Sequence, residues 1–220
     1  MRPSTSKRRF RATITNPTSS PPSRRSTHDV FISFRGVDVR NTFVDHLHST
    51  LGRKRVIGFR DDDNMDDSNV GENVDQRILR AIEDSSSYVV VLTRNYGSSA
   101  WCLDELVHIM RCSRHNWGRR SRIFPIFYHV TPEDVSSGCY EDDFDQHKRR
   151  YTYERVDGWL RALAWIVGIS GWVVTSGQSE AALVESIAGT IQRHAHRAAD
   201  KTDSTGRSME MRYRRREITN

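Results

Sequence analysis

The sequence predicts an α/β domain built on a five-stranded parallel sheet with helices on both of its faces. Short apolar runs rich in Val, Ile and Phe alternate with amphipathic segments along the chain, which is the order that strand–helix–strand units produce. The runs are apolar throughout rather than at every second residue, as is typical of parallel strands buried on both faces. The 220 residues suffice for one domain of ordinary size with tails.

Five segments are expected to be strands. Val30–Phe34 and Tyr88–Leu92 are the clearest, because they are almost wholly β-branched or aromatic. Val56–Phe59 is expected to be a short second strand, and Trp172–Val174 the fifth. The fourth, Ile123–Tyr128, contains a proline, which donates no backbone hydrogen bond. We therefore expect this strand near an edge of the sheet or at a bulge.

The segments between the strands carry apolar residues three and four positions apart, which predicts helices with one buried face. Asn41 is expected to cap the first of them, and the helix after the third strand is expected to span Leu103–Cys112. The apolar stripes are, in chain order, Phe43, Leu47 and Leu51; Val74, Ile78, Leu79 and Ile82; Leu103, Leu106, Val107 and Met110; Trp159, Leu160, Leu163, Ile166 and Val167; and Leu183, Ile187 and Ile191.

Right-handed crossover connections leave few ways to arrange five such strands, and we expect the flavodoxin-like order 2-1-3-4-5. In this order the first and third strands are neighbours, and their connections leave in opposite directions. Ligands in such folds bind beyond the carboxyl ends of the strands at this switch point. Ser33–Arg40 and Thr93–Glu105 are therefore expected to lie side by side and to form a ligand crevice.

The two segments carry side chains that suit an anionic ligand. Gly36 lets the backbone turn and leaves room for a ligand, while Arg35 and Arg40 supply planar cations suited to phosphate groups. Asp104 and Glu105 are expected in the first turn of the following helix, where the helix dipole favours anions. From position alone two interpretations stay open: these acids serve the site, or they merely occupy a favourable helix start.

The net charge of +6 comes from the ends of the chain rather than from its middle. Residues 1–27 hold seven basic side chains and no acidic one, and residues 200–220 hold six basic and four acidic ones. The stretch between is slightly acidic, which makes nucleic acid an unlikely partner. The three cysteines include no CxxC pair, which argues against a disulfide scaffold or a structural metal site and fits a reducing compartment. No apolar run is long enough to span a membrane.

Both ends of the chain are expected to be disordered, with one folded domain over residues 28–196. Residues 1–27 form a basic leader rich in Ser and Pro. An organellar transit peptide is the alternative, since such peptides are rich in Arg and Ser and poor in acids. Residues 197–220 form a polar tail. The expected location is cytoplasmic, or organellar if the leader is a transit peptide.

Five motifs, in chain order, resemble those of plant TIR (Toll/interleukin-1 receptor) domains. Together they extend over roughly residues 28–195, at family-like spacing. The chain thus resembles a TIR-only protein related to the TIR-class disease resistance proteins. The motifs are His28–Gly36; Phe59–Asp62; Asn95–Leu106; Phe124–Tyr128 with Val130, Pro132, Asp134 and Val135; and Ser170–Trp172.

The resemblance implies an enzyme that cleaves NAD⁺ or NADP⁺ between nicotinamide and ribose, with NAD⁺ as substrate and with neither cofactor nor metal. In the family, the glutamate of the Trp-Cys-Leu-x-Glu-Leu motif is catalytic, and it falls here on Glu105. One carboxylate suits this chemistry, because nicotinamide leaves as a neutral molecule and only the positive charge developing on the ribose needs stabilising. The family pattern places the dinucleotide site at Arg35, Gly36, Val37, Asp38, Val39 and Arg40, with Arg60 as a weaker candidate for a phosphate contact.

The resemblance also implies self-association and binding to other TIR-domain proteins. Asp45 and His46 occupy the place of a Ser-His pair that helps to form a helix-to-helix interface in the family. Read alone, His46 would be an ordinary surface histidine. The loop Asp61–Gly71 departs from the family pattern, because it is more acidic, about two residues longer and without a basic-Gly pair. It lacks the glycine that a calcium loop requires, and its charge repels a pyrophosphate, so we expect weak catalysis.

Three functions were weighed on these grounds. The first is an NAD⁺ nucleosidase that is activated by self-association and acts in plant immune signal transduction. The second is a non-catalytic adaptor that binds other TIR-containing resistance proteins, which the altered loop favours. The third, a phosphoacceptor receiver domain, requires an aspartate at the end of the third strand, and Thr93-Arg94-Asn95 stands there instead. The sequence contains no phosphate-binding P-loop and no leucine-rich repeat.

Overall fold

The computed structural model describes residues 27–60, 76–115 and 122–197. The expected leader, apart from Thr27, the acidic loop Asp61–Gly71 and nearly all of the expected C-terminal tail lie outside the described residues. Among those that are described, no helix combines the length and the apolar content needed to cross a bilayer.

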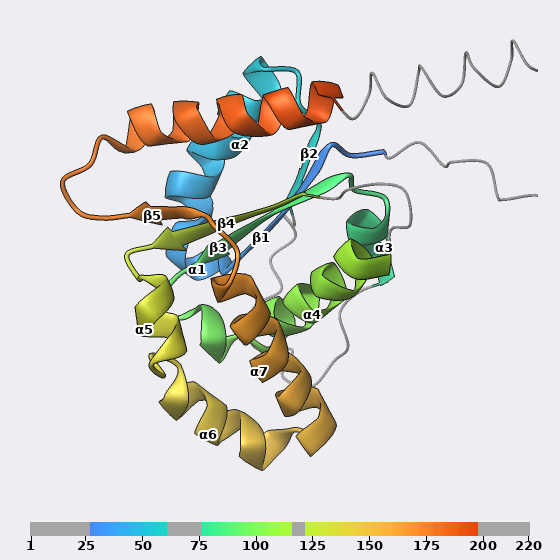
Figure 1. Cartoon of the computed structure of the whole chain (residues 1–220), viewed down its shortest axis with the longest axis vertical. Coiled ribbons are helices and arrows are strands. Elements are labelled where there is room, and N and C mark those ends of the chain that lie inside the picture. Colours follow the sequence, from blue (N-terminus) through green and yellow to red (C-terminus); the bar gives the residue numbers. More distant parts are fainter. Residues whose placement is uncertain (1–26, 61–75, 116–121, 198–220) are drawn as a thin grey trace, which may run out of the picture.

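The sheet is parallel and has the predicted order, β2-β1-β3-β4-β5 (Figure 1). β1 and β3 are central and their residues are fully buried, as continuous apolar runs require. β4 lies next to the edge strand β5, which confirms the position inferred from its proline, and the β5 pairing begins only at Ile126. The strands are β1 (Val30–Phe34), β2 (Gly58–Arg60), β3 (Ser87–Leu92), β4 (Arg122–Tyr128) and β5 (Trp172–Val174).

Helices cover both faces of the sheet, as predicted (Figure 1). α2 and a last helix over residues 180–197 lie on one face, and α3, α4 and α7 lie on the other. The helices are α1 (Gly36–Val39), α2 (Asp45–Arg53), α3 (Gln76–Glu83), α4 (Ala100–His115), α5 (Pro132–Ser136), α6 (Glu141–Arg150) and α7 (Tyr153–Val167), with a π-helical segment over Arg40–Val44 and a 3-10 turn over Tyr96–Ser98.

Each face of the sheet has its own hydrophobic core. The core on the α2 side joins β1 and β3 to the predicted stripe Phe43, Leu47 and Leu51, and to Ile187 and Ile191 of the last helix. The core on the α4 side contains the side chains on the opposite faces of the same strands, together with α3, α4 and α7. Burial of both faces follows from the continuous apolar runs, because no strand has a polar side that water could cover.

Several expectations about the helices were wrong. The first helical stretch begins at Gly36, directly after β1, so Asn41 lies inside it and does not cap it. Leu160 is 44% exposed, because the buried stripe of α7 consists instead of Val156, Trp159, Ala162, Leu163 and Ile166. α5 and α6 were not expected at all. α6 buries only Phe144 and His147, which is too few for an apolar stripe to be visible.

We predict that Gly171→Ala weakens the attachment of β5. A Cβ atom at this position would lie 2.3 Å from the carbonyl oxygen of Pro125, and a backbone oxygen in a strand has little freedom to move. The expected loss is about 1–3 kcal/mol in the free energy of unfolding, as for other overpacked sites. Urea titration followed by circular dichroism measures it. Gly52→Ala is the matched control, because nothing lies within 4 Å of its Cβ position and alanine favours a helix. If Gly171→Ala destabilised the protein no more than Gly52→Ala does, the prediction would be contradicted.

Candidate active site

The two segments that were predicted to meet do lie side by side at the carboxyl ends of β1 and β3. Phe34 at the end of β1 pairs with Val91 of β3. Beyond the strands, Nη1 of Arg35 donates a hydrogen bond to the carbonyl oxygen of Asn95 at 3.0 Å. Asp38 accepts hydrogen bonds from the Thr93 hydroxyl and, at 3.2 Å, from Nδ2 of Asn95. Arg35 and Asp38 therefore tie the two walls of the crevice together.

Glu105 points from α4 towards the end of β1. Its Oε2 is hydrogen-bonded to Oγ of Ser33 at 2.6 Å, and its Oε1 accepts a hydrogen bond from Nε1 of Trp101 at 3.1 Å. The side chain is only 4% exposed. Because α4 begins at Ala100 rather than at Leu103, Glu105 lies in the second turn, so its expected position in the first turn was wrong.

Asp104, the neighbouring acid, points in another direction. Its carboxylate is bound by Arg155 at 2.5 Å and by Nε1 of Trp159 at 2.7 Å, both from α7. The Arg155 guanidinium also stacks over the rings of Tyr151 and Trp159, at 4.7 and 5.3 Å. Asp104 thus fastens α4 to α7, while Glu105 faces the crevice. Neither acid lies in the first turn of α4, and the role of Glu105 in a site stays a prediction.

The other residues predicted to bind substrate differ in their exposure. Val37 is 84% exposed at the rim, whereas Val39 is buried in the core. A Cβ atom on Gly36 would come within 2.6 Å of the Arg40 guanidinium, so the flexible end of the Arg40 side chain would have to shift. The Arg40 guanidinium lies 5.3 Å from the centre of the Phe34 ring. Arg40 therefore keeps its charge beside the turn that follows β1, close to the crevice.

Arg60, Asp45 and His46 lie together near the α2 side of the sheet. Nη1 of Arg60 forms an ion pair with Oδ1 of Asp45 at 2.9 Å, so the two predicted residues contact each other. The Asp45 side chain is 49% exposed and that of His46 is 67% exposed. Nδ1 of His46 lies 3.5 Å from Oε1 of Glu180, at the start of the last helix. A face that includes α2 and this helix is accessible to a partner.

Sequence reasoning missed the residues that support the crevice from α6 and its N-cap. The Tyr140 hydroxyl donates to the carbonyl oxygen of Thr93 at 2.6 Å, and Nε2 of His147 is hydrogen-bonded to the carbonyl oxygen of Gly97 at 2.9 Å. A Cβ atom on Gly97 would lie 2.4 Å from the Tyr140 ring, so glycine is required there. Burial raises the pKa of Asp143, while the nearby His147 and Arg35 act to lower it. No motif marked these contacts.

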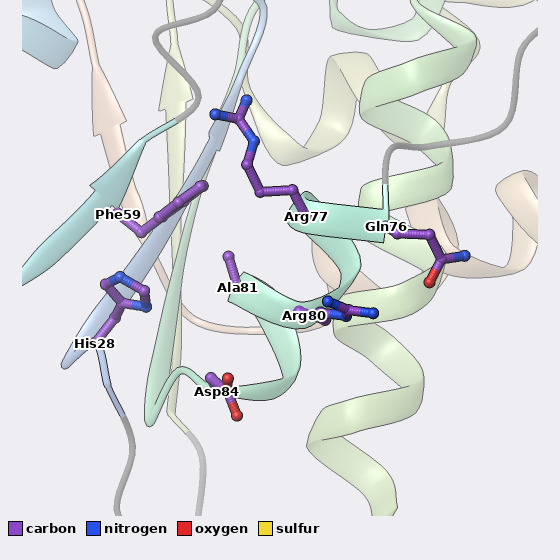
Figure 2. A pocket seen from close by; sticks show the side chains of 7 residues that line it. All are labelled: His28, Phe59, Gln76, Arg77, Arg80, Ala81 and Asp84. Carbon is purple, nitrogen blue, oxygen red and sulfur yellow. The ribbon is translucent and has the colours of Figure 1, made fainter.

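A pocket of about 430 Å³ lies away from this crevice, near the ends where β1 and β3 begin. Figure 2 shows His28 and Phe59 on the sheet side of the pocket and Ala81 opposite them on α3, whereas the side chains of Gln76 and Arg80 point away from the sheet. The crevice, with its fixed acid, remains the better candidate for chemistry.

The sheet order and the helices on both faces define a flavodoxin-like α/β domain, in which the two predicted segments meet at the topological switch point. The sequence model of the TIR domain family matches residues 27–211, and the chain belongs to this family.

The chain is similar to plant resistance proteins. It is 40% identical over 186 residues to disease resistance protein RPV1 of Vitis rotundifolia, covering 84% of this chain and 13% of that protein. It is 33% identical over 177 residues to TMV resistance protein N of Nicotiana glutinosa, covering 79% of this chain and 15% of that protein. The chain therefore spans only a small part of the length of these curated relatives.

A solved structure of related domains supports the fold. The chain matches TIR domains in the structure of the activated Roq1 resistosome, which recognises the pathogen effector XopQ. The TM-score is 0.65 and the sequence identity 33%, and the match covers 75% of this chain and 99% of that one. The match thus extends over nearly the whole of that chain.

Proposed function

We propose that this TIR domain is an NAD⁺ nucleosidase that is activated by self-association and acts in plant immune signalling. The observation that carries the proposal is the placement of Glu105, a single carboxylate held beneath the junction of the two crevice walls by Ser33 and Trp101. Carboxylates are seldom buried in proteins unless they are paired, and a buried acid beside cationic side chains is a candidate for catalysis.

The proposed reaction breaks the bond between C1′ of the ribose and the nicotinamide nitrogen. The bonding electrons move to that nitrogen, so the cationic ring leaves as neutral nicotinamide and needs no acid to protonate it. Positive charge develops on the ribose, and a carboxylate close to the ring stabilises it. A water molecule or another nucleophile then attacks C1′. Glu105 supplies the negative charge in this scheme.

The cations of the crevice are suited to the pyrophosphate of the same substrate. Arg35 and Arg40 both follow β1, so they lie on the same wall, and Glu105 reaches that wall from α4. Arg35 already bonds to Asn95 and lies near Asp38, which fixes its position. The Arg40 guanidinium, beside the Phe34 ring, is the second cation on this wall that suits a phosphate group. A substrate that extends from Glu105 towards Arg40 would place its ribose and its phosphates correctly.

Self-association is proposed because the substrate must reach a carboxylate that is only 4% exposed. Some segment must therefore shift before cleavage, and contact with a second copy provides a force for that shift. Asp45 and His46 are exposed on α2 and available for such a contact. The matched Roq1 domains belong to an assembly. We propose other TIR domains as further partners and the cytoplasm as the location.

The test is the dependence of nicotinamide release on protein concentration. We expect the activity per molecule to rise with concentration, because only associated copies are active. His46→Ala should lower this rise, and fusion to a tetramer-forming scaffold should restore activity to the variant. Ser49→Ala, an exposed change on the same helix, is the matched control. Activity per molecule that is constant over a hundredfold range of concentration would contradict activation by association.

One observation favours the adaptor as a second candidate. Both carboxylate oxygens of Glu105 already take part in internal hydrogen bonds, as they would if the residue were purely structural. In that case the scaffold-fused wild type would release no nicotinamide and would still bind other TIR domains in a pull-down experiment. Release of nicotinamide by the fused wild type excludes this alternative.

A further inference from the structure

Four buried groups form a continuous hydrogen-bonded chain around Glu105. Oγ of Ser33 lies 2.6 Å from Oε2 of Glu105 and 3.0 Å from the Tyr96 hydroxyl. The Tyr96 hydroxyl lies 3.0 Å from the carbonyl oxygen of Cys102. Ser33 and Tyr96 are themselves fully buried, so water does not replace a missing partner easily. Each contact in this chain therefore needs a proton of its own.

The number of protons available to this hydrogen-bonded chain indicates the charge state of Glu105. The three contacts need three protons, and the hydroxyl groups of Ser33 and Tyr96 supply one each. The Cys102 carbonyl group only accepts. If Glu105 is ionised, one of the three oxygen pairs has no proton between its atoms. A protonated Glu105 supplies the third: Oε2 donates to Ser33, Ser33 donates to Tyr96, and Tyr96 donates to Cys102.

The hydrogen bond between Trp101 and Glu105 fits the same arrangement. Oε1 becomes the carbonyl oxygen of the neutral acid, and it accepts the hydrogen bond from Nε1 of Trp101 at 3.1 Å. The burial of the carboxyl group acts in the same direction, since a charged group loses more than a neutral one when it leaves water. We propose that Ser33 and Tyr96 are positioning residues that hold Glu105 as a neutral carboxylic acid in the resting protein.

Other titratable and charged groups lie on the elements that pack around Glu105. On the 3-10 turn, burial raises the pKa of Tyr96, so its hydroxyl keeps its proton. On its own helix, Cys102 approaches the Phe34 carbonyl with its sulfur, and Asp104 is bound to Arg155 of α7. On the wall that follows β1, Arg35 lies beside Asp38. Arg40 is the positive charge on that wall which would favour ionisation when the crevice opens.

This inference rests on the proposed NAD⁺ cleavage, and its consequence is that the resting site does not cleave NAD⁺. A neutral acid has no negative charge with which to stabilise a cationic ribose. When a movement of the crevice breaks the contact with Ser33, Oε2 gives its proton to the solvent and keeps the electron pair. Activation should therefore release one proton for each site, and the activity of associated copies should rise with pH up to a plateau.

Infrared difference spectroscopy tests the resting state without any NAD⁺. At neutral pH, the spectrum of the wild type minus that of Glu105→Gln should contain the carbonyl stretch of a protonated carboxylic acid, and raising the pH should remove it. Ser33→Ala removes the acceptor of the proton, so the band should disappear about one pH unit lower. If Ser33 instead donates its proton to an ionised Glu105, the wild type should have no such band at neutral pH. Ser33→Ala should then raise the pH at which Glu105 loses its proton.

Two further variants test whether a change in the band comes from the hydrogen-bonded chain around Glu105. Tyr96→Phe keeps the ring and removes the acceptor of the Ser33 proton, so it should shift the band in the same direction as Ser33→Ala. Ser87→Ala changes an equally buried serine at the other end of the neighbouring strand, and it should leave the band unchanged. Absence of the band from the wild type overturns the inference even if the protein cleaves NAD⁺. A band in a protein that never cleaves NAD⁺ supports the neutral acid and overturns the proposed function.

Discussion

Glu105→Gln is expected to lower nicotinamide release from the scaffold-fused protein by about 100-fold or more, which is the usual effect of removing one group that stabilises transition-state charge. The glutamine side chain has nearly the same volume and retains partners for Ser33 and Trp101, so the fold should not change. It has no negative charge, however, and resembles the neutral acid of the resting state. High-performance liquid chromatography of the reaction mixture measures the released nicotinamide.

The matched control for this experiment is Glu154→Gln. Glu154 is an exposed glutamate in the first turn of α7, away from the crevice. Its replacement makes the same change of charge at the surface, and the rate should stay within a factor of two of the wild type. If Glu105→Gln also stayed within that factor, the carboxylate would have no role in cleavage, and any observed activity would have to come from another group.

Asp104→Asn is expected to act on stability, although Asp104 is adjacent to Glu105 in the sequence. Asp104 accepts hydrogen bonds from Arg155 and from Trp159, and both partners belong to α7. The asparagine loses the charge opposite a partly buried guanidinium, and its amide group replaces one acceptor with a donor. We expect the free energy of unfolding to fall by about 2 kcal/mol, as for other charged hydrogen bonds that lose one partner. Urea titration followed by tryptophan fluorescence measures this change.

Asp157→Asn provides the comparison on α7 itself. Asp157 pairs with Arg161, whose side chain is mostly exposed, and such surface pairs contribute about 0.5 kcal/mol or less. Asp104→Asn should therefore destabilise the protein several times more than Asp157→Asn does. Equal effects of the two substitutions would show that the connection between α4 and α7 does not depend on Asp104.

The sheet and the place of the crevice could be predicted because both follow from local pattern and handedness. Val30–Phe34 and Tyr88–Leu92 are almost wholly apolar, which identifies them as central strands. Once five strands alternate with helices, the right-handed crossover rule leaves β1 and β3 as neighbours. The contact between Arg35 and Asn95 follows from the adjacent positions of β1 and β3 in the sheet.

Other features could not be predicted, because they depend on contacts between residues far apart in the sequence. The position of Glu105 in its helix left its role open, and the direction of its side chain became clear only with Ser33 in place, 72 residues earlier. α6 has almost no apolar residues, since it covers the crevice with polar contacts such as that of His147 with Gly97. A helix of this kind leaves no hydrophobic period in the sequence.

The central claim is that NAD⁺ binds where the two crevice walls meet, beside Glu105. Hydrogen–deuterium exchange of scaffold-fused Glu105→Gln, with and without NAD⁺, tests it most directly, because this variant should bind the dinucleotide without consuming it. We expect NAD⁺ to slow exchange in peptides that cover residues 33–40 and 93–105, and to leave α3 unchanged. Protection confined to His28 and α3, around the pocket of Figure 2, or no protection at any NAD⁺ concentration, would contradict the account.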